Sequence, residues 1–225
     1  MMTTGHDARD AARHAGTILE YWFSTLDDAE RLDRAVEPFR TCYQRWYGKD
    51  PAVDAEIRTR FEPLLLEVTK DGRRLNDTIS AFRQAPYGLL ALLVLLDQLP
   101  RNIYRNTPGM YAHDPLALAV ALEAIREHEH DEALPIVRRM FLYVPLMHVE
   151  NLTLQQYMLA QFDDLVERAR TRSPQNQGFL EFARDYARRH VDVVAKFGRF
   201  PHRNEILGRH STPAEKAHLV DNPGF

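Results

Sequence analysis

Apolar residues recur along this chain three or four positions apart, which is the spacing of one face of an α-helix. The first stretch predicts a helix over residues 10–23, preceded by a loose terminus over residues 1–9. A second helix is expected over residues 29–47. It needs a kink or break at Pro38, because proline disturbs the interior of a helix.

Capping signals locate the later helices. Asp50-Pro51 and Asp114-Pro115 are typical of helix starts, and Asp71-Gly72 is typical of a helix end. The Glu127–His130 run of alternating acids and histidines is interpreted as a solvated helix end, because alternate residues on a helix do not face each other. A short segment around residues 75–82 leads to Pro86. Further helices are expected over residues 116–125, 135–144 (interrupted by Pro145), 154–170 and 179–197. A short last helix is expected after a capping box at 212–215.

The longest apolar run covers residues 89–96 and contains no polar side chain. A membrane-spanning helix needs about 20 such residues, so this run is too short to cross a bilayer. A helix of this composition is instead expected to be buried on all sides. We place it at the centre of the protein, starting at Pro86 and closed by Pro100.

No segment alternates apolar and polar residues for long enough to predict a β-strand. Nine or ten helices with short connections give an all-α fold class. Their lengths favour antiparallel pairs stacked side by side, although the sequence holds no 34-residue repeat of the tetratricopeptide kind. We expect one all-helical domain over residues 1–225.

Composition and charge limit the function classes. The chain is 44% hydrophobic and 27% charged, as expected of a soluble globular protein. Its formal net charge of -3 argues against a dedicated nucleic-acid binder, which usually shows a basic excess. Cys42 is the only cysteine; this excludes an internal disulfide and a cysteine-based zinc site, and a small buried side chain is expected there. Without a secretory pattern at the N-terminus, we expect a cytoplasmic protein with no membrane partner.

Candidate chemistry gathers at residues 197–209, which read FGRFPHRNEILGR. Two phenylalanines are unusual in a surface loop, and three arginines with a histidine are unusual in a core segment. We therefore expect a dense group of hydrogen-bond donors at the edge of the core. A second polar group directly follows the buried helix, where it is well placed to line the mouth of a pocket: Asp97, Gln98, Arg101, Asn102 and Arg105.

Several blocks of the chain resemble one bacterial family. The blocks are YWF at 21–23, LLDQLPRNIYR at 95–105, FLYVPLMHVEN at 141–151, and FGRFPHRNEILGR at 197–209 followed by STPAE. Over nearly its whole length the chain resembles the family named domain of unknown function 924. The resemblance implies an all-helical, tetratricopeptide-like fold and no particular reaction. The positions that match the family's motifs are Asp97, Gln98, Arg101, Asn102, Arg105, His148, Glu150, Gln156, Arg199, His202, Arg203, Asn204 and Arg209.

The balance of charge in these blocks leaves two interpretations open. In the structural one, Asp97, Glu150 and Glu205 neutralise arginines of the same blocks. Five arginines then face three carboxylates, and a buried surplus of positive charge is costly. In the functional one, a bound anion completes the set, because guanidinium groups match carboxylates and phosphates. The candidate ligand-binding residues are Arg101, Asn102, Arg105, Gln156, Arg199, His202, Arg203, Asn204 and Arg209.

Histidines raise two further possibilities. His148 and Glu150, with His190 and His202, could supply metal ligands, but the HxE spacing alone is a weak signal and no HExxH motif occurs. We predict no metal and no cofactor. An enzyme could use His148 or His202 as general acid or base, with Glu150 orienting a histidine. These three are the candidate catalytic residues.

Taken together, these patterns predict a pocket rich in arginine and histidine that binds a small anionic molecule or the acidic end of a peptide. One alternative is an enzyme acting at the same pocket. Another is a protein-interaction scaffold whose ion network is purely structural. A deep pocket with a histidine beside a carboxylate favours the enzyme, whereas a long open groove favours the scaffold.

Overall fold

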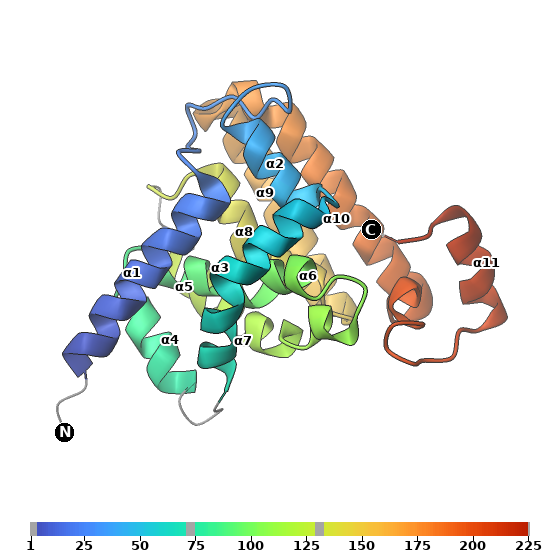
Figure 1. Cartoon of the computed structure of the whole chain (residues 1–225). Helices are drawn as coiled ribbons and strands as arrows, with labels where there is room; N and C mark the ends of the chain where they lie inside the picture. Colours follow the sequence, from blue (N-terminus) through green and yellow to red (C-terminus); the bar gives the residue numbers. More distant parts are fainter. Residues whose placement is uncertain (1–3, 71–74, 129–132, 225) are drawn as a thin grey trace.

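The computed structural model describes residues 4–70, 75–128 and 133–224. Within these ranges the chain consists of helices and connecting turns without a strand, so the protein is all-α (Figure 1). The α-helices are α1 (Thr4–Phe23), α2 (Phe39–Tyr47), α3 (Pro51–Thr69), α4 (Leu75–Arg83), α5 (Gly88–Leu93), α6 (Leu99–Ile103), α7 (Asp114–His128), α8 (Ile136–Met147), α9 (Leu152–Arg172), α10 (Gln177–Phe197) and α11 (Pro213–Asp221).

The apolar run over residues 89–96 lies at the centre of the core. Every side chain in it is at most 1% exposed. Helices α1, α4, α7 and α8 all pack on α5. Full burial of one leucine contributes about 1.5–3 kcal/mol, so the run is a major source of stability. The prediction of a helix buried on all sides is confirmed.

The predicted end of the central helix at Pro100 is wrong, because the chain stays helical beyond this residue. A π-helical turn, Val94–Gln98, joins α5 to α6, and the N–H of Leu99 donates to the carbonyl of Val94 five residues earlier. Proline lacks an N–H, and its ring clashes with the carbonyl four residues before it in a regular α-helix. The wider turn accommodates Pro100, and the chain stays helical to Ile103. The polar side chains that follow are therefore held on a helix.

The predicted helix over residues 29–47 is shorter in the structure, where α2 begins only at Phe39. Polar side chains satisfy the backbone of the preceding residues instead. The Asp27 carboxylate accepts from the N–H groups of residues 29 and 30, and the Asn176 amide accepts from the N–H of Leu32. Such side-chain bonds compete with helix formation.

Other boundaries also differ from the prediction. α1 begins at Thr4, so residues 4–9 are helical and not loose. Pro145 lies inside the last turn of α8, which runs on to Met147. Two predicted features, the Asp71-Gly72 helix end and the Glu129-His130 pair, lie outside the described residues.

Helices α8, α9 and α10 pack in chain order, each on the one before it. Gly198 then ends α10 in the left-handed conformation, with φ of 70°, as glycine does at many helix ends. The chain continues through residues 198–212, called the C-terminal segment below, to α11, which lies far from α1 in Figure 1. None of the helices in the described ranges has the length and apolar character needed to cross a bilayer.

We predict that Leu93→Asp prevents folding to a stable protein. Leu93 is 1% exposed, so the carboxylate would lose its hydration with no partner. Leu66→Asp is the matched control, because Leu66 on α3 is 54% exposed. Circular dichroism and urea unfolding should show loss of the native state only for Leu93→Asp. Equal stability of the two variants would contradict the central placement of α5.

Candidate functional site

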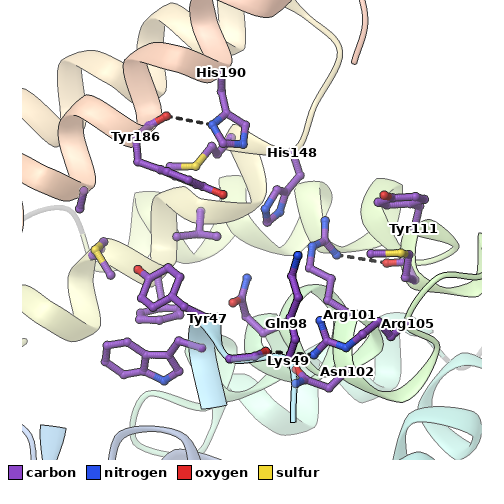
Figure 2. A pocket seen from close by; sticks show the side chains of 18 of the residues that line it. Tyr47, Lys49, Gln98, Arg101, Asn102, Arg105, Tyr111, His148, Tyr186 and His190 are labelled. Atoms are coloured by element: carbon purple, nitrogen blue, oxygen red, sulfur yellow. Dashed lines mark hydrogen bonds between the residues drawn. The ribbon is translucent and has the colours of Figure 1, made fainter. Parts of the chain in front are cut away.

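A cavity of about 240 Å³ lies where α2, α6, α8, α9 and α10 meet the C-terminal segment (Figure 2). One part of its wall is apolar: Trp46, Met110, Met140, Phe141, Val144, Met147, Phe162, Phe182 and Ala183. The rest is polar or backbone: Tyr47, Gly48, Lys49, Gln98, Arg101, Asn102, Arg105, Tyr111, His148, Tyr186, His190, His202 and Arg203. Four cationic side chains thus line the cavity, and no aspartate or glutamate of the described residues does.

Asp97 sits behind this wall, on the π-helical turn, and is 1% exposed. Its Oδ1 lies 2.8 Å from Nδ1 of His148 and 3.6 Å from Nη2 of Arg101, and its Oδ2 accepts from the amide of Gln98. Burial raises the pKa of Asp97, but Arg101 and His148 outweigh burial and hold that pKa below its ordinary value. The carboxylate is therefore charged.

His148 follows the last turn of α8, and its side chain is 14% exposed. Burial, with a smaller contribution from Arg101, lowers the pKa of His148 below its ordinary value, against the opposing effect of Asp97. The imidazole is neutral at pH 7, and a charged carboxylate only accepts, so the proton resides on Nδ1 and Nε2 carries the free lone pair. The carboxylate that contacts His148 is that of Asp97, whereas Glu150 accepts from Arg209 and from the N–H of Phe200.

Arg101 and Arg203 share one carboxylate, that of Asp114 at the start of α7. Both Nη atoms of Arg101 lie 3.0 Å from Oδ1 of Asp114, and Nη1 of Arg203 lies 3.2 Å from Oδ2. Arg203 is only 7% exposed, stacks over the rings of Tyr111 and Phe200, and has no hydrogen-bond partner for its Nε among the described residues. Burial lowers the pKa of Arg203, which shows how unfavourable this place is for a cation.

Arg105 and Asn102 are held by a second carboxylate, that of Asp54, which is not among the predicted site residues. Asp54, in the first turn of α3, accepts from Nε of Arg105 at 2.6 Å and from the amide of Asn102 at 2.9 Å. Asp54 follows the predicted helix start at Asp50-Pro51, and Asp114 is part of the one at Asp114-Pro115. Both therefore resembled the acidic residues that are common in the first turn of a helix. The sequence signal for these contacts was the pair Arg101 and Arg105, four residues apart after the central helix, because buried arginines need carboxylate partners from other elements.

Three predicted ligand-binding residues hold the C-terminal segment and do not line the cavity. Arg209 donates to both oxygens of Glu150, at 2.7 and 2.9 Å, and Glu150 also accepts from the N–H of Phe200. Arg199 pairs with Glu215 at 2.6 Å, and Asn204 donates to Ser211. Glu215 also completes the predicted capping box with Thr212.

Two predicted site residues lie on the surface. Gln156 is exposed on α9, while its neighbour Gln155 is fully buried and donates to the carbonyls of Met147 and Val149. Glu205, expected in the ion network, is exposed and makes no ion pair with an arginine among the described residues. Helical position explains both differences, because adjacent residues of a helix or turn point in different directions.

The arginine surplus expected from the sequence disappears once these contacts are counted. The five arginines of the motif blocks are paired with five carboxylates: Asp54, Asp97, Asp114, Glu150 and Glu215. What remains is an asymmetry of position. Arg101, Arg105 and Arg203 line the cavity, whereas none of the five carboxylates does.

Two further histidines line the cavity near His148. His190 is 3% exposed, with Nδ1 at 3.0 Å from the carbonyl of Tyr186, and burial lowers its pKa well below the ordinary value. Burial and Arg203 lower the pKa of His202 to about 4. In the described residues no three or more histidine, cysteine, aspartate and glutamate side chains are grouped closely enough to hold a metal ion. Cys42 is buried away from the cavity lining, and burial raises the pKa of its thiol to about 11.

We predict that Arg101→Ala destabilises the protein by about 3–5 kcal/mol, because Asp97 is left charged and buried without its cation. Arg170→Ala is the matched control. Arg170 pairs with Glu167 on the surface, where both side chains are more than half exposed, and such a pair contributes under about 1 kcal/mol. Urea unfolding measures both values. A small loss for Arg101→Ala would mean that Asp97 is not held by this ion pair.

We also predict that stability falls as the pH is lowered from 7 to 5. An unfolded histidine takes up a proton near pH 6.5, whereas folded His202 does so only near pH 4. The unfolded state therefore binds more protons in this window and gains stability relative to the native state. His202→Gln should flatten the dependence of Tm on pH, with the exposed His210→Gln as control. An unchanged slope in His202→Gln would contradict this assignment.

Comparison with known proteins agrees with the motif blocks. The family model described as "Bacterial protein of unknown function (DUF924)" matches residues 18–224. A solved structure, that of the protein of unknown function ATU0120 from Agrobacterium tumefaciens, is 32% identical to this chain with a TM-score of 0.70. The match covers 95% of this chain and 100% of that one. No curated protein matches the chain. The resemblance noted in the sequence is thus confirmed, and the chain belongs to the DUF924 family.

Proposed function

We propose that the cavity binds a small molecule that carries an anionic group. The observation that carries this proposal is the lining itself, in which Lys49, Arg101, Arg105 and Arg203 face the space and no acidic side chain of the described residues does. A carboxylate or phosphate placed there gains charge-assisted hydrogen bonds in a site of low dielectric. Tyr186 is a further donor at this wall, because burial raises the pKa of its hydroxyl to about 12.

Arg203 distinguishes a binding role from a purely structural one. Its carboxylate partner, Asp114, also accepts from both Nη groups of Arg101, so Asp114 keeps a cationic hydrogen-bond partner when Arg203 is replaced. Placing a second guanidinium beside Arg101 costs desolvation and like-charge repulsion. A bound anion offsets that cost.

The size of the cavity favours a small molecule over the acidic end of a peptide. A space of about 240 Å³ is below the usual range of ligand pockets, and residues of five helices and the C-terminal segment surround it. The packing of α8, α9 and α10 in chain order supports the inference of stacked, tetratricopeptide-like helix pairs. A peptide-binding scaffold of this kind would use a long open groove, which differs from the small cavity described above.

A second candidate function is an enzyme at the same cavity. The contact between Asp97 and Nδ1 of His148 favours it, because a histidine oriented by a carboxylate is the usual form of a general base. The remaining alternative, a scaffold with a purely structural ion network, is supported by the pairing of every motif arginine.

We predict that sulfate, phosphate and citrate raise the Tm of the parent protein by mass action and that Arg203→Ala loses this response. In their absence, Arg203→Ala should be about as stable as the parent, because Asp114 keeps Arg101. Arg199→Ala is the matched control. It removes an arginine of the same segment whose partner is Glu215 and which does not line the cavity, so it should keep the response.

Two results would reject the binding proposal in favour of the structural network. One is a parent protein that no anion protects. The other is an Arg203→Ala variant that unfolds far more readily than the parent yet keeps the same anion response.

A further inference from the structure

A histidine that can act as a base, His148, and a cation, Arg101, lie next to each other on the cavity wall. Oδ1 of Asp97 contacts both Nδ1 of His148, at 2.8 Å, and Nη2 of Arg101, at 3.6 Å, so one carboxylate oxygen holds the two groups next to each other. Figure 2 shows the His148 ring and the Arg101 side chain close together at the cavity. Anion binding alone does not require this arrangement.

We propose that His148 is a catalytic base that removes a proton from the carbon next to the carbonyl group of a small 2-oxo acid bound in this cavity. Arg101 stabilises the enolate that forms, and Asp97 is a positioning residue. The proposal rests on the proposed function, because the carboxylate of the acid is held by the same cationic wall.

The ring of His148 has the form that a base needs. Its Nδ1–H donates to Asp97, which fixes the ring and leaves the lone pair on Nε2. Asp97 also stabilises the imidazolium that exists after proton transfer. The charged and titratable groups around the ring are Asp97, Arg101 and Asp114, with His190 and His202 farther along the wall.

The backbone that carries Asp97 is a second, independent indication. Asp97 and Gln98 lie in the π-helical turn between α5 and α6, and single π turns within helices occur frequently at functional sites. The turn accommodates Pro100, but an apolar residue at position 97 would fit an apolar interior equally well. A charged Asp97 costs desolvation that its neighbours must offset.

The residues that line the cavity limit the classes of reaction that it can catalyse. It contains no serine, threonine, cysteine or acidic side chain among the described residues, so a covalent intermediate on such a group is excluded there. The small volume suits a reaction within one molecule better than one that releases two products. The apolar wall, with Met140, Phe141 and Val144, suits an aliphatic chain beyond the reacting carbon.

The chemical step balances without a co-reactant. The C3–H bond of the 2-oxo acid breaks, and its proton passes to Nε2 of His148. The electron pair forms the C2–C3 double bond, and the carbonyl pair moves to the oxygen, where the guanidinium of Arg101 stabilises the charge. Return of a proton to C3 from the imidazolium restores the acid or its isomer, with no net oxidation.

Exchange with deuterium tests the step without knowledge of the natural substrate. The full-length protein is incubated in D₂O with pyruvate, 2-oxobutanoate or 2-oxohexanoate, and loss of the C3 proton signal is followed by NMR. We expect exchange above the protein-free rate. We also expect the Kd, from Tm shifts, to tighten up to about fourfold for each methylene that the apolar wall buries.

His148→Asn is the decisive variant. Its amide can donate to Asp97 from the place of Nδ1 but offers no ring base, so exchange should fall at least about 100-fold while the Tm shift caused by the acids remains. His148→Gln is the second variant should the first not fold, and the exposed His210→Gln is the control that keeps full exchange. Asp97→Asn should slow exchange and move the limb of its pH profile that reports His148 to lower pH, a change that a merely structural role would not cause.

The outcomes separate this inference from the proposed function. Acids that raise the Tm but show no exchange overturn the catalytic proposal and leave anion binding standing. Exchange that persists in both His148 variants assigns the proton transfer to another group and also overturns it. Failure of the acids, sulfate, phosphate and citrate alike to raise the Tm overturns both proposals.

Discussion

The structure depends on one constraint: the charged carboxylate of Asp97 lies in the π-helical turn directly after α5, a helix whose residues are all buried. A carboxylate out of contact with water is stable only when hydrogen bonds and opposite charge replace its hydration. Gln98, Arg101 and His148 supply them, and each also lines the cavity. The partners that stabilise the buried charge are thus the groups that give the cavity its chemistry.

The C-terminal segment completes this site from a distance. The pair of Arg209 with Glu150 fixes the backbone at Phe200, which places Arg203 and His202 at the cavity. Arg203 then contacts Asp114, which also holds Arg101. Asp114 of α7 and Glu150, just before α9, therefore position Arg203 and Arg209 of the C-terminal segment. The same ion pairs serve the fold and set the electrostatic field of the cavity.

The sequence predicted what local pattern controls. An eight-residue apolar run, a capping box and the spacing of apolar residues were enough for the fold class, the central helix and the last helix. Contacts between distant segments could not be read this way. Asp54 and Asp114 resembled helix-start residues. The pattern did not reveal that Asp54 accepts from Arg105, 51 residues later, or that Asp114 accepts from Arg101, 13 residues earlier. Pro100 was misinterpreted because a stop signal and a π turn have the same sequence signature at that point. The sequence therefore predicted which residue types form the candidate site. It did not distinguish the residues that line the cavity from those that hold the C-terminal segment.

Arg203 and Asp114 are 89 residues apart in the chain, and Arg209 and Glu150 are 59 apart. Contacts between such distant residues require large loops to close, so their formation is slow compared with pairing of neighbouring helices. During synthesis, helices α1 to α9 are complete by residue 172 and can begin to bury their apolar faces before residue 203 is added. The nascent protein accordingly has an interior before it has a finished cavity. A ligand that touches Arg203 would recognise only chains that have completed this last step.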